Sequence, residues 1–411
     1  MTAIVSILNK HAVSLAADSA MTIGGRKVYN SANKLFSLSK YKPVAIAFYN
    51  NLSLVNCPWE VVTKEYRRHL GKRSFATLME YVADFFNFLK TQNYFSTVTE
   101  QHQQIEWEFQ NYLDSVLDDM NRLNLANEFN AFVNDQEAQF YSRMNNLLSI
   151  GTFSKDEFKL MYDHEISEAL RHVKNVYNVD LDKDVVSHQL FSMFVKDMWL
   201  SNMTGIVFCG YGDKEIYPCL YNYDSYVVIN NKLAIFPHDE KTIEIGKPAP
   251  AAIRTFAQTD VMDTLTFGIA PSVRTIYREN LSKPLIDVLN KIGDKVGNAG
   301  VKQTIADFIK NDLDSYVDDY MSECAKAAQK TYAQPFLNSM TSLEKEDLAD
   351  FAESMIKVTS IKRKVSPTLA TVDGPIDVMV ISKAEGVIWI KRKHYFSPEL
   401  NHSFFNNYHM D

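Results

Sequence analysis

Residues 1–36 read MTAIVSILNKHAVSLAADSAMTIGGRKVYNSANKLF, and this stretch decides the fold that the sequence predicts. The segments TAIVSILN and AVSLAAD alternate or run apolar, as short buried strands do, and NKLFSL follows them. Turns are predicted at residues 9–11 and 24–25, the second because its two glycines accept the positive φ angles that tight hairpin turns require. Residues 42–49, KPVAIAFY, add a further buried strand. The chain therefore begins with consecutive strands joined by tight turns.

The rest of the chain divides into long helical and strand-rich segments. Residues 59–201 read as amphipathic helices, about five or six of them, and strand patterns return over residues 203–236. Three more helical stretches are expected next: residues 260–292, 301–330 and 343–364. Two final strands, IDVMVIS and GVIWIKR, turn at Ala384-Glu385-Gly386. This order favours an α+β or layered αββα domain over a doubly wound sheet, and it implies that the first and last strands share a sheet.

The same pattern suggests a domain organisation. Residues 1–55 and 202–411 are expected to form one core, and residues 56–201 are expected to be a large helical insertion that elaborates it. Capping-box spacing predicts three helix starts, at Thr97-x-x-Glu100, Ser154-x-x-Glu157 and Thr341-x-x-Glu344.

Charge and composition narrow the classes of partner. The chain has 411 residues, 46% of them hydrophobic, with a formal net charge of −7, which argues against a nucleic-acid binder or a protein of anionic membrane surfaces. Short basic runs at 362–364 and 391–393 are most simply the solvated ends of a helix or strand.

The cysteines and the N-terminal sequence indicate in which cellular compartment the protein is expected and whether it is expected to bind a metal. The four cysteines have neither metal-finger spacing nor a disulfide-scaffold pattern. The N-terminus lacks the pattern of a signal peptide, and no run approaches the roughly 20 apolar residues of a membrane span. We therefore expect a cytoplasmic protein that needs no metal or other cofactor.

The N-terminal strands also resemble a known family. The pieces TAIVSI, AVSLAADSAMT, SANKLF and VAIAFYN resemble the start of proteasome β subunits and of the related bacterial peptidase HslV, which are N-terminal nucleophile (Ntn) hydrolases. The segments GIVFCGYGDKEIYPCLYNYD and DGPIDVMVISKAEGVIWI are similar to later strands of that family. The resemblance covers about a third of the chain, and it implies a four-layer αββα sandwich.

The resemblance also implies a catalytic group made of Thr2, Asp18 and Lys34. A threonine hydroxyl is a weak nucleophile until a base removes its proton, and the α-amino group of the same residue can act as that base. A neighbouring lysine ammonium would lower the pKa of this amine, which is about 7.7–8.0 when unperturbed, and so keep it available as a base. Asp18 would hold the ammonium of Lys34 charged and oriented. Met1 must first be removed, because an amide nitrogen on Thr2 cannot act as a base.

Other parts of the family's site are matched less closely. The family places a glycine where this chain has Asn50, whose backbone N–H would donate to the oxyanion; asparagine tolerates positive φ better than most residues. Thr259 or Asp260 stands where a supporting serine is expected. Asp373 stands, with Gly374, where the family has a serine-glycine pair, and it would take an altered supporting role.

Each of these residues taken singly is ordinary, and only their joint placement on a strand pattern favours a catalytic interpretation. The first hypothesis is a threonine peptidase that cleaves protein or peptide substrates through an acyl-enzyme, as a homo-oligomer, with or without an ATPase partner. The alternatives are a catalytically inactive scaffold or regulatory binding protein and an amidase that acts on small amides.

Overall fold

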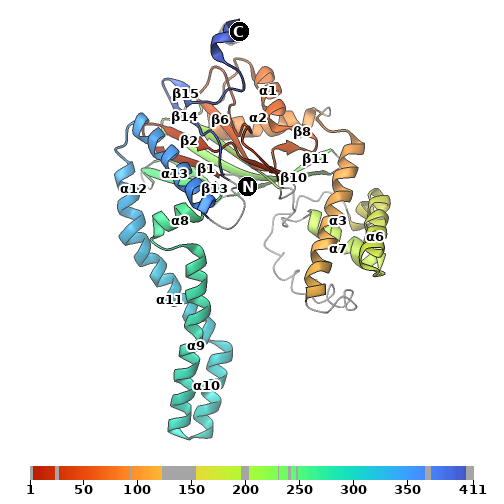
Figure 1. Cartoon of the computed structure of the whole chain (residues 1–411), viewed down its shortest axis with the longest axis vertical. Helices are drawn as coiled ribbons and strands as arrows, with labels where there is room; N and C mark the ends of the chain where they lie inside the picture. Colours follow the sequence, from red (N-terminus) through yellow and green to blue (C-terminus); the bar gives the residue numbers. More distant parts are fainter. Residues whose placement is uncertain are drawn as a thin grey trace. The chain divides into compact units, whose positions relative to one another are not determined.

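The computed structural model describes residues 3–23, 27–92, 95–122, 154–195, 203–229, 231–238, 242–246, 249–365 and 372–403. The chain forms two compact units, whose helices and strands are labelled in Figure 1. The first unit comprises residues 1–32, 245–380 and 389–411, and the second comprises residues 33–244 and 381–388. The predicted insertion, residues 56–201, lies wholly within the second unit.

A five-stranded antiparallel sheet lies mainly in the first unit, although residues 381–388 of its last two strands and their turn are assigned to the second unit. Its strands follow the order β13 (Ala251–Ala257), β1 (Ala3–Asn9), β2 (Val13–Ala17), β14 (Asp377–Ser382) and β15 (Gly386–Lys391). The expectation that the first and last strands share a sheet is thereby confirmed. A separate two-stranded ribbon pairs β3 (Met21–Ile23) with β4 (Lys27–Tyr29), on either side of the predicted glycine turn at 24–25, which lies outside the described residues.

The predicted turn between β1 and β2 is present and is closed by Asn9. The buried Oδ1 of Asn9 accepts hydrogen bonds from the backbone N–H groups of His11 (2.8 Å) and Ala12 (3.2 Å). Its Nδ2 donates to the carbonyl oxygens of Met340 (3.0 Å) and Leu343 (2.8 Å). The Asn9 side chain therefore satisfies backbone hydrogen-bonding groups in the turn and in the segment around residues 340–343.

Helix α13 (Lys345–Val365) covers the face formed by β1 and β2. Leu348, Ala352 and Ile356, spaced four residues apart, form a buried stripe that packs on Val5 and Ile7. Full burial of each large aliphatic side chain contributes about 1.5–3 kcal/mol. The predicted start of this helix at Thr341 is wrong: Thr341 Oγ1 donates to Asn338 O and so ends α12 (Gln334–Met340), while α13 begins four residues later.

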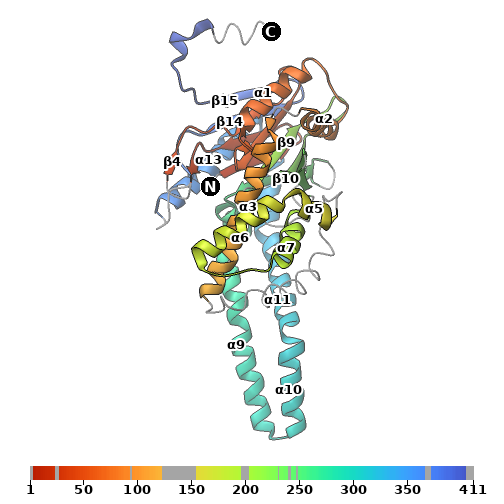
Figure 2. The ribbon, with the colours of Figure 1, turned by 90° about the vertical axis from the view of Figure 1, so that its right-hand side faces the viewer.

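Between β13 and α12 the first unit builds a helical hairpin. Its helices are α8 (Asp260–Phe267), α9 (Pro271–Val296), α10 (Ala299–Asn311) and α11 (Leu313–Ala328), and a π-helical turn over Gln329–Ala333 leads into α12. The two helices expected over 260–292 and 301–330 are each broken, at Gly268 and Asp312 respectively. Figures 1 and 2 show α9 running beside α10 and α11 and extending away from the sheet of its unit.

The second unit is built on another antiparallel sheet. Its strands follow the order β11 (Lys232–Pro237), β10 (Cys219–Ile229), β9 (Thr204–Gly210), β6 (Val44–Asn50) and β5 (Leu35–Ser37), and the short β12 (Ile243–Glu244) pairs with β10. The turn after β10 includes Asn231, which has a φ of 60°. A small ribbon, β7 (Ser53–Leu54) with β8 (Cys57–Pro58), precedes the helices.

Helices α1 (Trp59–Leu70) and α2 (Leu78–Thr91) pack on one face of this sheet through aromatic side chains. Phe48 of β6 stacks on Trp59, with ring centroids 5.0 Å apart, and Phe85 of α2 contacts Phe208 of β9 edge-on. Contacts of this kind contribute about 0.5–1.5 kcal/mol each beyond the burial of area. The aromatic content of the sequence is thus used in a layer between sheet and helices.

The other helices of the second unit within the described residues form their own cluster. They are α3 (Val98–Arg122), α5 (Lys155–Met161), α6 (Asp163–Tyr177) and α7 (Lys183–Val195), and α6 lies beside α3 (Figure 2). Their shared core includes Phe109, Phe158 and Ile166, and it continues onto β10 and β11. The capping boxes predicted at Thr97 and Ser154 are confirmed.

The antiparallel sheets and their helices confirm the α+β class. The four-layer αββα stacking of the two sheets stays a prediction. Within the described residues, no helix combines the length and the apolarity needed to cross a lipid bilayer.

Candidate active site

The carboxylate of Asp18 is the best-defined feature among the predicted site residues. Asp18 follows β2, and only 1% of its surface is exposed. Its Oδ1 accepts a hydrogen bond from the backbone N–H of Ala3 (2.9 Å), and its Oδ2 accepts from Ala20 (3.0 Å) and Asp373 (3.4 Å). Three backbone donors thus satisfy the oxygens of this carboxylate, and a buried polar group without such partners would be costly.

Asp18 holds the first described residue of the chain. Its backbone N–H donates to Ala3 O (3.3 Å), while Ala3 N–H donates to its side chain. The pair thus extends the β1–β2 ladder, in which Ile4 lies opposite Ala17, by one more residue. Thr2, the predicted nucleophile, is the neighbour of Ala3 in the sequence and lies outside the described residues.

Asp373 lies next to Asp18, although its side chain points to other partners. Its backbone N–H contacts Asp18, and its carbonyl accepts from Ser19 N (3.2 Å). Its carboxylate forms an ion pair with Lys364 (2.8 Å), and this hydrogen bond, together with the N–H of Gly374, lowers the pKa of Asp373 below its usual value. Asp373 therefore supports Asp18 through its backbone.

Gly374, the partner of Asp373 in the predicted pair, is required by the local backbone. Its φ is 82°, and a Cβ at this position would lie 2.7 Å from Asn30 Cβ. Both facts exclude a larger residue without a rearrangement.

Thr259 and Asp260 begin helix α8, two and three residues beyond Ala257, which pairs with Ala3. Asp260 is engaged elsewhere, because its carboxylate forms ion pairs with Lys362 (2.7 Å) and Arg363 (2.6 Å) of α13. Burial acts to raise the pKa of Asp260, but the hydrogen bond from Lys362 and the charge of Arg363 outweigh it, so the pKa is lowered. Its ion pairs tie α8 to the end of α13.

The lowered pKa of Asp260 predicts a pH-dependent contribution to stability. We expect Asp260→Asn to lower the free energy of unfolding by about 1 kcal/mol at neutral pH, because the ion pairs are partly exposed. The difference from the parent protein is fully present above the unfolded pKa of about 3.9 and disappears as the pH falls through the lower folded pKa. Urea unfolding midpoints at a series of pH values measure it, and a difference that persists unchanged at low pH would contradict this assignment.

Lys34 and Asn50 belong to the second unit. Lys34 precedes β5, is 1% exposed, and its carbonyl accepts a hydrogen bond from Phe48 N (2.9 Å). Asn50 ends β6 opposite Thr204 and has a φ of 64°. The positive φ that the sequence made plausible for Asn50 is therefore present, in a residue type that tolerates it.

Sequence reasoning missed a buried polar row beside Asn50. Tyr49 lies opposite Gly205 of β9, and its hydroxyl reaches across that strand to Asn222 Oδ1 (3.2 Å) and Asp224 Oδ1 (3.4 Å) of β10. Asp224 Oδ2 contacts His238 Nε2. Burial, and then the negative charge of Asp224, raise the pKa of Tyr49 well above its usual value, so the phenol stays protonated and donates.

The residues of this row can be recognised in the sequence, but the sequence near them does not predict that they contact one another. NYD at residues 222–224 alternates polar side chains on one face of a strand, and Gly205 has space for a ring above it. Only the strand order β10, β9, β6 brings these residues together.

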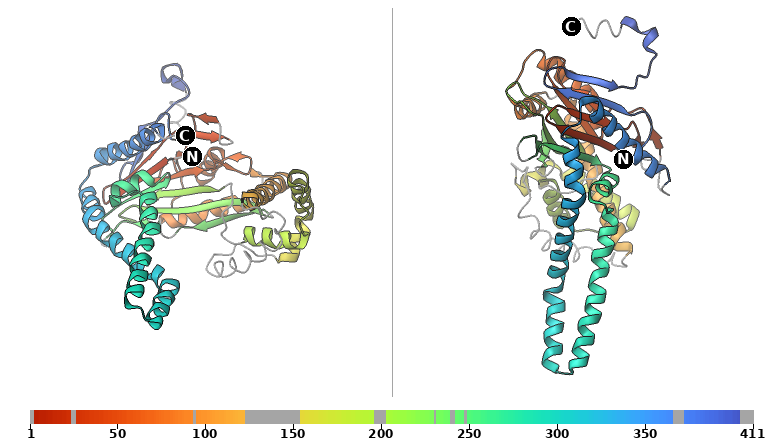
Figure 3. Two further views of the ribbon diagram at one scale, coloured as in Figure 1. Left: turned by 60° about the horizontal axis from the view of Figure 1, so that its bottom comes forward. Right: turned by 90° about the vertical axis from the view of Figure 1, so that its left-hand side faces the viewer.

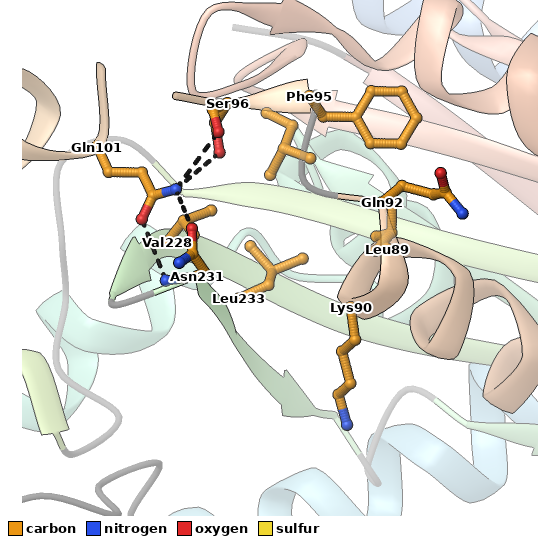
Figure 4. Close-up of a pocket in the computed structure, with 10 residues that line it drawn as sticks. Leu89, Lys90, Gln92, Phe95, Ser96, Gln101, Val228, Asn231 and Leu233 are labelled. Carbon is orange, nitrogen blue, oxygen red and sulfur yellow. Dashed lines mark hydrogen bonds between the residues drawn. The ribbon is translucent and has the colours of Figure 1, made fainter. Parts of the chain in front are cut away.

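The second unit also contains a small pocket between α2, the start of α3 and the β10–β11 turn (Figure 4). Its interior volume is about 30 Å³, which is room for about one or two water molecules. Gln101 Nε2 donates to Asn231 Oδ1 (2.8 Å) and Ser96 Oγ (3.2 Å), and its Oε1 accepts from Asn231 N (3.1 Å). The polar groups of Ser96, Gln101 and Asn231 thus satisfy one another, and we assign the pocket a structural role.

Comparison with known proteins yields structural neighbours only. No protein-family model matches the sequence, and a comparison with curated proteins finds no match. Similar solved structures include the Gly-1 mutant of Anbu from Hyphomicrobium sp. strain MC1, at 8% identity and a TM-score of 0.30, covering 99% of this chain and 94% of that one. Anbu (ancestral beta-subunit) from Yersinia bercovieri is 9% identical, with a TM-score of 0.27 and coverage of 98% and 94%.

A third structure describes the helical assembly of the Anbu complex from Pseudomonas aeruginosa, at 9% identity and a TM-score of 0.29, covering 99% of this chain and 94% of that one. TM-scores this low do not establish a common fold. The expected membership in the proteasome β-subunit and HslV family is nevertheless wrong, because these similar structures are Anbu proteins.

Proposed function

We propose that this protein is an N-terminal nucleophile hydrolase that cleaves amide bonds, with Thr2 as the nucleophile. The observation that carries the proposal is the buried Asp18 carboxylate, which accepts a hydrogen bond from Ala3, the first residue of β1 and the one after Thr2. A buried carboxylate held by three backbone donors is a rigid anchor, and catalytic groups need such anchors to keep a reactive geometry.

In the proposed reaction the Thr2 hydroxyl attacks the amide carbonyl while the free α-amino group of Thr2 takes up the hydroxyl proton. The proton then passes to the departing amine, and an ester links the acyl group to Thr2. Water, deprotonated by the same amino group, hydrolyses the ester and restores the enzyme. Each step balances without a metal or a redox partner.

The other residues receive roles from the sequence. Lys34 would supply the positive charge that keeps the amino group unprotonated, and Asp18 would orient that charge. The backbone N–H of Asn50 would donate to the oxyanion, a role that its positive φ supports by turning the chain at the end of β6. Thr259, Asp260 and Asp373 have supporting roles at most, since the carboxylates of Asp260 and Asp373 are bound by basic side chains.

The proposed substrate is a protein or peptide, and small amides are the alternative substrate class. A catalytically inactive scaffold is the alternative function. The covalent state of Thr2 separates the two functions, because a retained Met1 removes the base.

The test is intact-mass measurement followed by labelling. We expect purified protein to lack Met1 and to form a one-to-one adduct with an electrophile selective for N-terminal threonine. Thr2→Ser should retain the adduct because it keeps a hydroxyl and an amine, whereas Thr2→Ala should lose it. Thr275→Ala is a matched control: Thr275 is an exposed threonine on α9 whose hydroxyl donates to Pro271 O.

Two results would overturn the proposal. One is a retained Met1 in protein from its native host, which would favour the inactive scaffold. The other is an adduct that forms equally on Thr2→Ala, which would place the reactive group elsewhere.

A further inference from the structure

The backbone N–H of Asn50 points away from β9. Asn51 N donates to Met203 O (3.1 Å), and hydrogen bonds alternate along an antiparallel ladder, so the N–H of residue 50 lies on the other side of β6. On that side Phe48 N donates to Lys34 O (2.9 Å), just before β5 begins. Asn50 is exposed and lies two residues further along, where the described ladder of β5 provides no acceptor. Its N–H is the donor that the proposed reaction assigns to the oxyanion.

The side chain of Tyr49, the other residue of this peptide bond, lies across the face of β9. The tyrosine is buried, and its ring covers Gly205, where an added Cβ would be 1.8 Å from Cζ. Its hydroxyl donates to Asn222 Oδ1 (3.2 Å) and Asp224 Oδ1 (3.4 Å) on β10, the green strand beside β9 in Figure 3. The ring therefore cannot tilt toward β9, and it cannot swing outward without losing these hydrogen bonds.

The acceptors of the Tyr49 hydroxyl are themselves held in place. Asp224 is buried, and its second carboxylate oxygen, Oδ2, contacts Nε2 of His238. His238 follows β11, and its backbone N–H donates to Asn222 O (2.9 Å). A row of hydrogen bonds thus runs from the end of β11 through β10 to the residue before Asn50. Such networks make buried side chains rigid.

The residue on the other side of Asn50 is also anchored. Asn51 O accepts from Thr204 Oγ1 (2.9 Å), which in turn accepts from Trp59 Nε1 (3.2 Å). Asn50 turns between these two anchors with its φ of 64°. A residue other than glycine keeps such a conformation when its surroundings hold it there. The direction of its N–H therefore depends on both neighbours being fixed.

We propose that Tyr49 is a positioning residue of the hydrolase site, because its hydrogen-bonded ring fixes the direction of the Asn50 N–H. Attack by Thr2 moves an electron pair of the C=O bond onto the carbonyl oxygen, and a donor that is already oriented stabilises this charge without reorganising. Tyr49 acts through the peptide bond that it shares with Asn50, not by contact with the substrate. This inference rests on the proposed function.

The test compares two probes with the same peptide sequence, both of which react with the Thr2 hydroxyl. A peptide boronate takes the hydroxyl oxygen onto boron and gives a tetrahedral anion that mimics the oxyanion. In a peptide vinyl sulfone the oxygen adds to the vinyl carbon farther from sulfur, the proton ends on the carbon next to sulfur, and no oxyanion forms. We expect Tyr49→Phe to bind the boronate at least about tenfold more weakly and to react with the vinyl sulfone within about twofold of the parent rate.

Tyr66→Phe is the matched control. Tyr66 is a buried tyrosine of α1 in the same unit, and its hydroxyl donates to Asp84 Oδ2 (2.9 Å). Both variants remove a buried phenol that donates to a carboxylate, but only Tyr49 shares a peptide bond with Asn50. Tyr66→Phe should therefore react with both probes as the parent does.

A second variant keeps Tyr49 and removes one of its acceptors. Asp224→Ala should also weaken boronate binding more than vinyl sulfone labelling, because the hydroxyl is then held only by Asn222. The double variant of Asp224→Ala with Tyr49→Phe should bind the boronate about as weakly as Tyr49→Phe alone, since no hydroxyl is left to position. An additive loss would contradict a route from Asp224 through Tyr49.

The outcomes separate this inference from the proposed function. A parent protein that reacts with neither probe would overturn both. If the parent reacts with both probes but Tyr49→Phe binds the boronate normally, the positioning role is wrong and the hydrolase function stands. The same holds if Tyr49→Phe weakens both probes equally, or if Tyr66→Phe weakens boronate binding as much.

Discussion

Replacement of Asp18 by alanine is expected to lower the free energy of unfolding by about 3–5 kcal/mol. The carboxylate is buried and accepts hydrogen bonds from Ala3, Ala20 and Asp373, so its removal leaves several backbone N–H groups without an acceptor. A buried unsatisfied donor costs about 1–3 kcal/mol. Urea unfolding monitored by circular dichroism measures the change.

Two variants sharpen this prediction. Asp18→Asn should cost less, about 1–3 kcal/mol, because its oxygen can still accept from Ala3 while its NH₂ group opposes the N–H of Ala20. Asp294→Asn is the surface control: that carboxylate is 74% exposed and pairs with Lys302, so a change below about 1 kcal/mol is expected. If Asp18→Ala were as mild as Asp294→Asn, the carboxylate would not be the anchor that the site requires.

Gly205→Ala is expected to destabilise the second unit by about 3 kcal/mol or more. A Cβ on Gly205 would lie 1.8 Å from Cζ of Tyr49, whose ring is buried and whose hydroxyl is held by Asn222 and Asp224. The ring cannot move away without losing these hydrogen bonds, and the strand cannot shift because β6 and β10 pair with it on both sides. The cost therefore comes from overpacking.

A double-mutant cycle tests this cause. Tyr49→Ala alone should be destabilising, but in that background Gly205→Ala should cost much less, since the clash is gone. Gly300→Ala, near the exposed start of α10, is the control and should be neutral or stabilising by up to about 1 kcal/mol. Additive effects of Gly205→Ala and Tyr49→Ala would show that the clash with the Tyr49 ring is not the reason why Gly205→Ala is destabilising.

The local features of the fold were predictable because they depend on residues near one another in the sequence. The strand pattern of the first 50 residues, the turn at Asn9 and the capping boxes at Thr97 and Ser154 all appear as expected. The capping box at Thr77 carries the same Thr-x-x-Glu signal and could have been predicted as well. Thr341 misled because the same signal also ends a helix, where its hydroxyl binds the preceding turn.

The candidate site was predictable only in part. The position of Asp18 at the end of a strand follows from the alternation of apolar residues, and the structure adds the donors that hold its carboxylate. Asp260 shows the limit of this reasoning, because its partners Lys362 and Arg363 lie about a hundred residues away in the sequence. A basic run that looked like a solvated helix end is in fact partly used to hold another helix.

The sequence by itself determined the α+β class and the presence of the first and last strands in one sheet. Only the tertiary structure decided why Gly205 is glycine and which groups surround Asp18. The physical reason is that these properties depend on side chains packed across strands and helices. Tyr49 and Asp224, for example, are 175 positions apart in the chain, and no local pattern records that they touch.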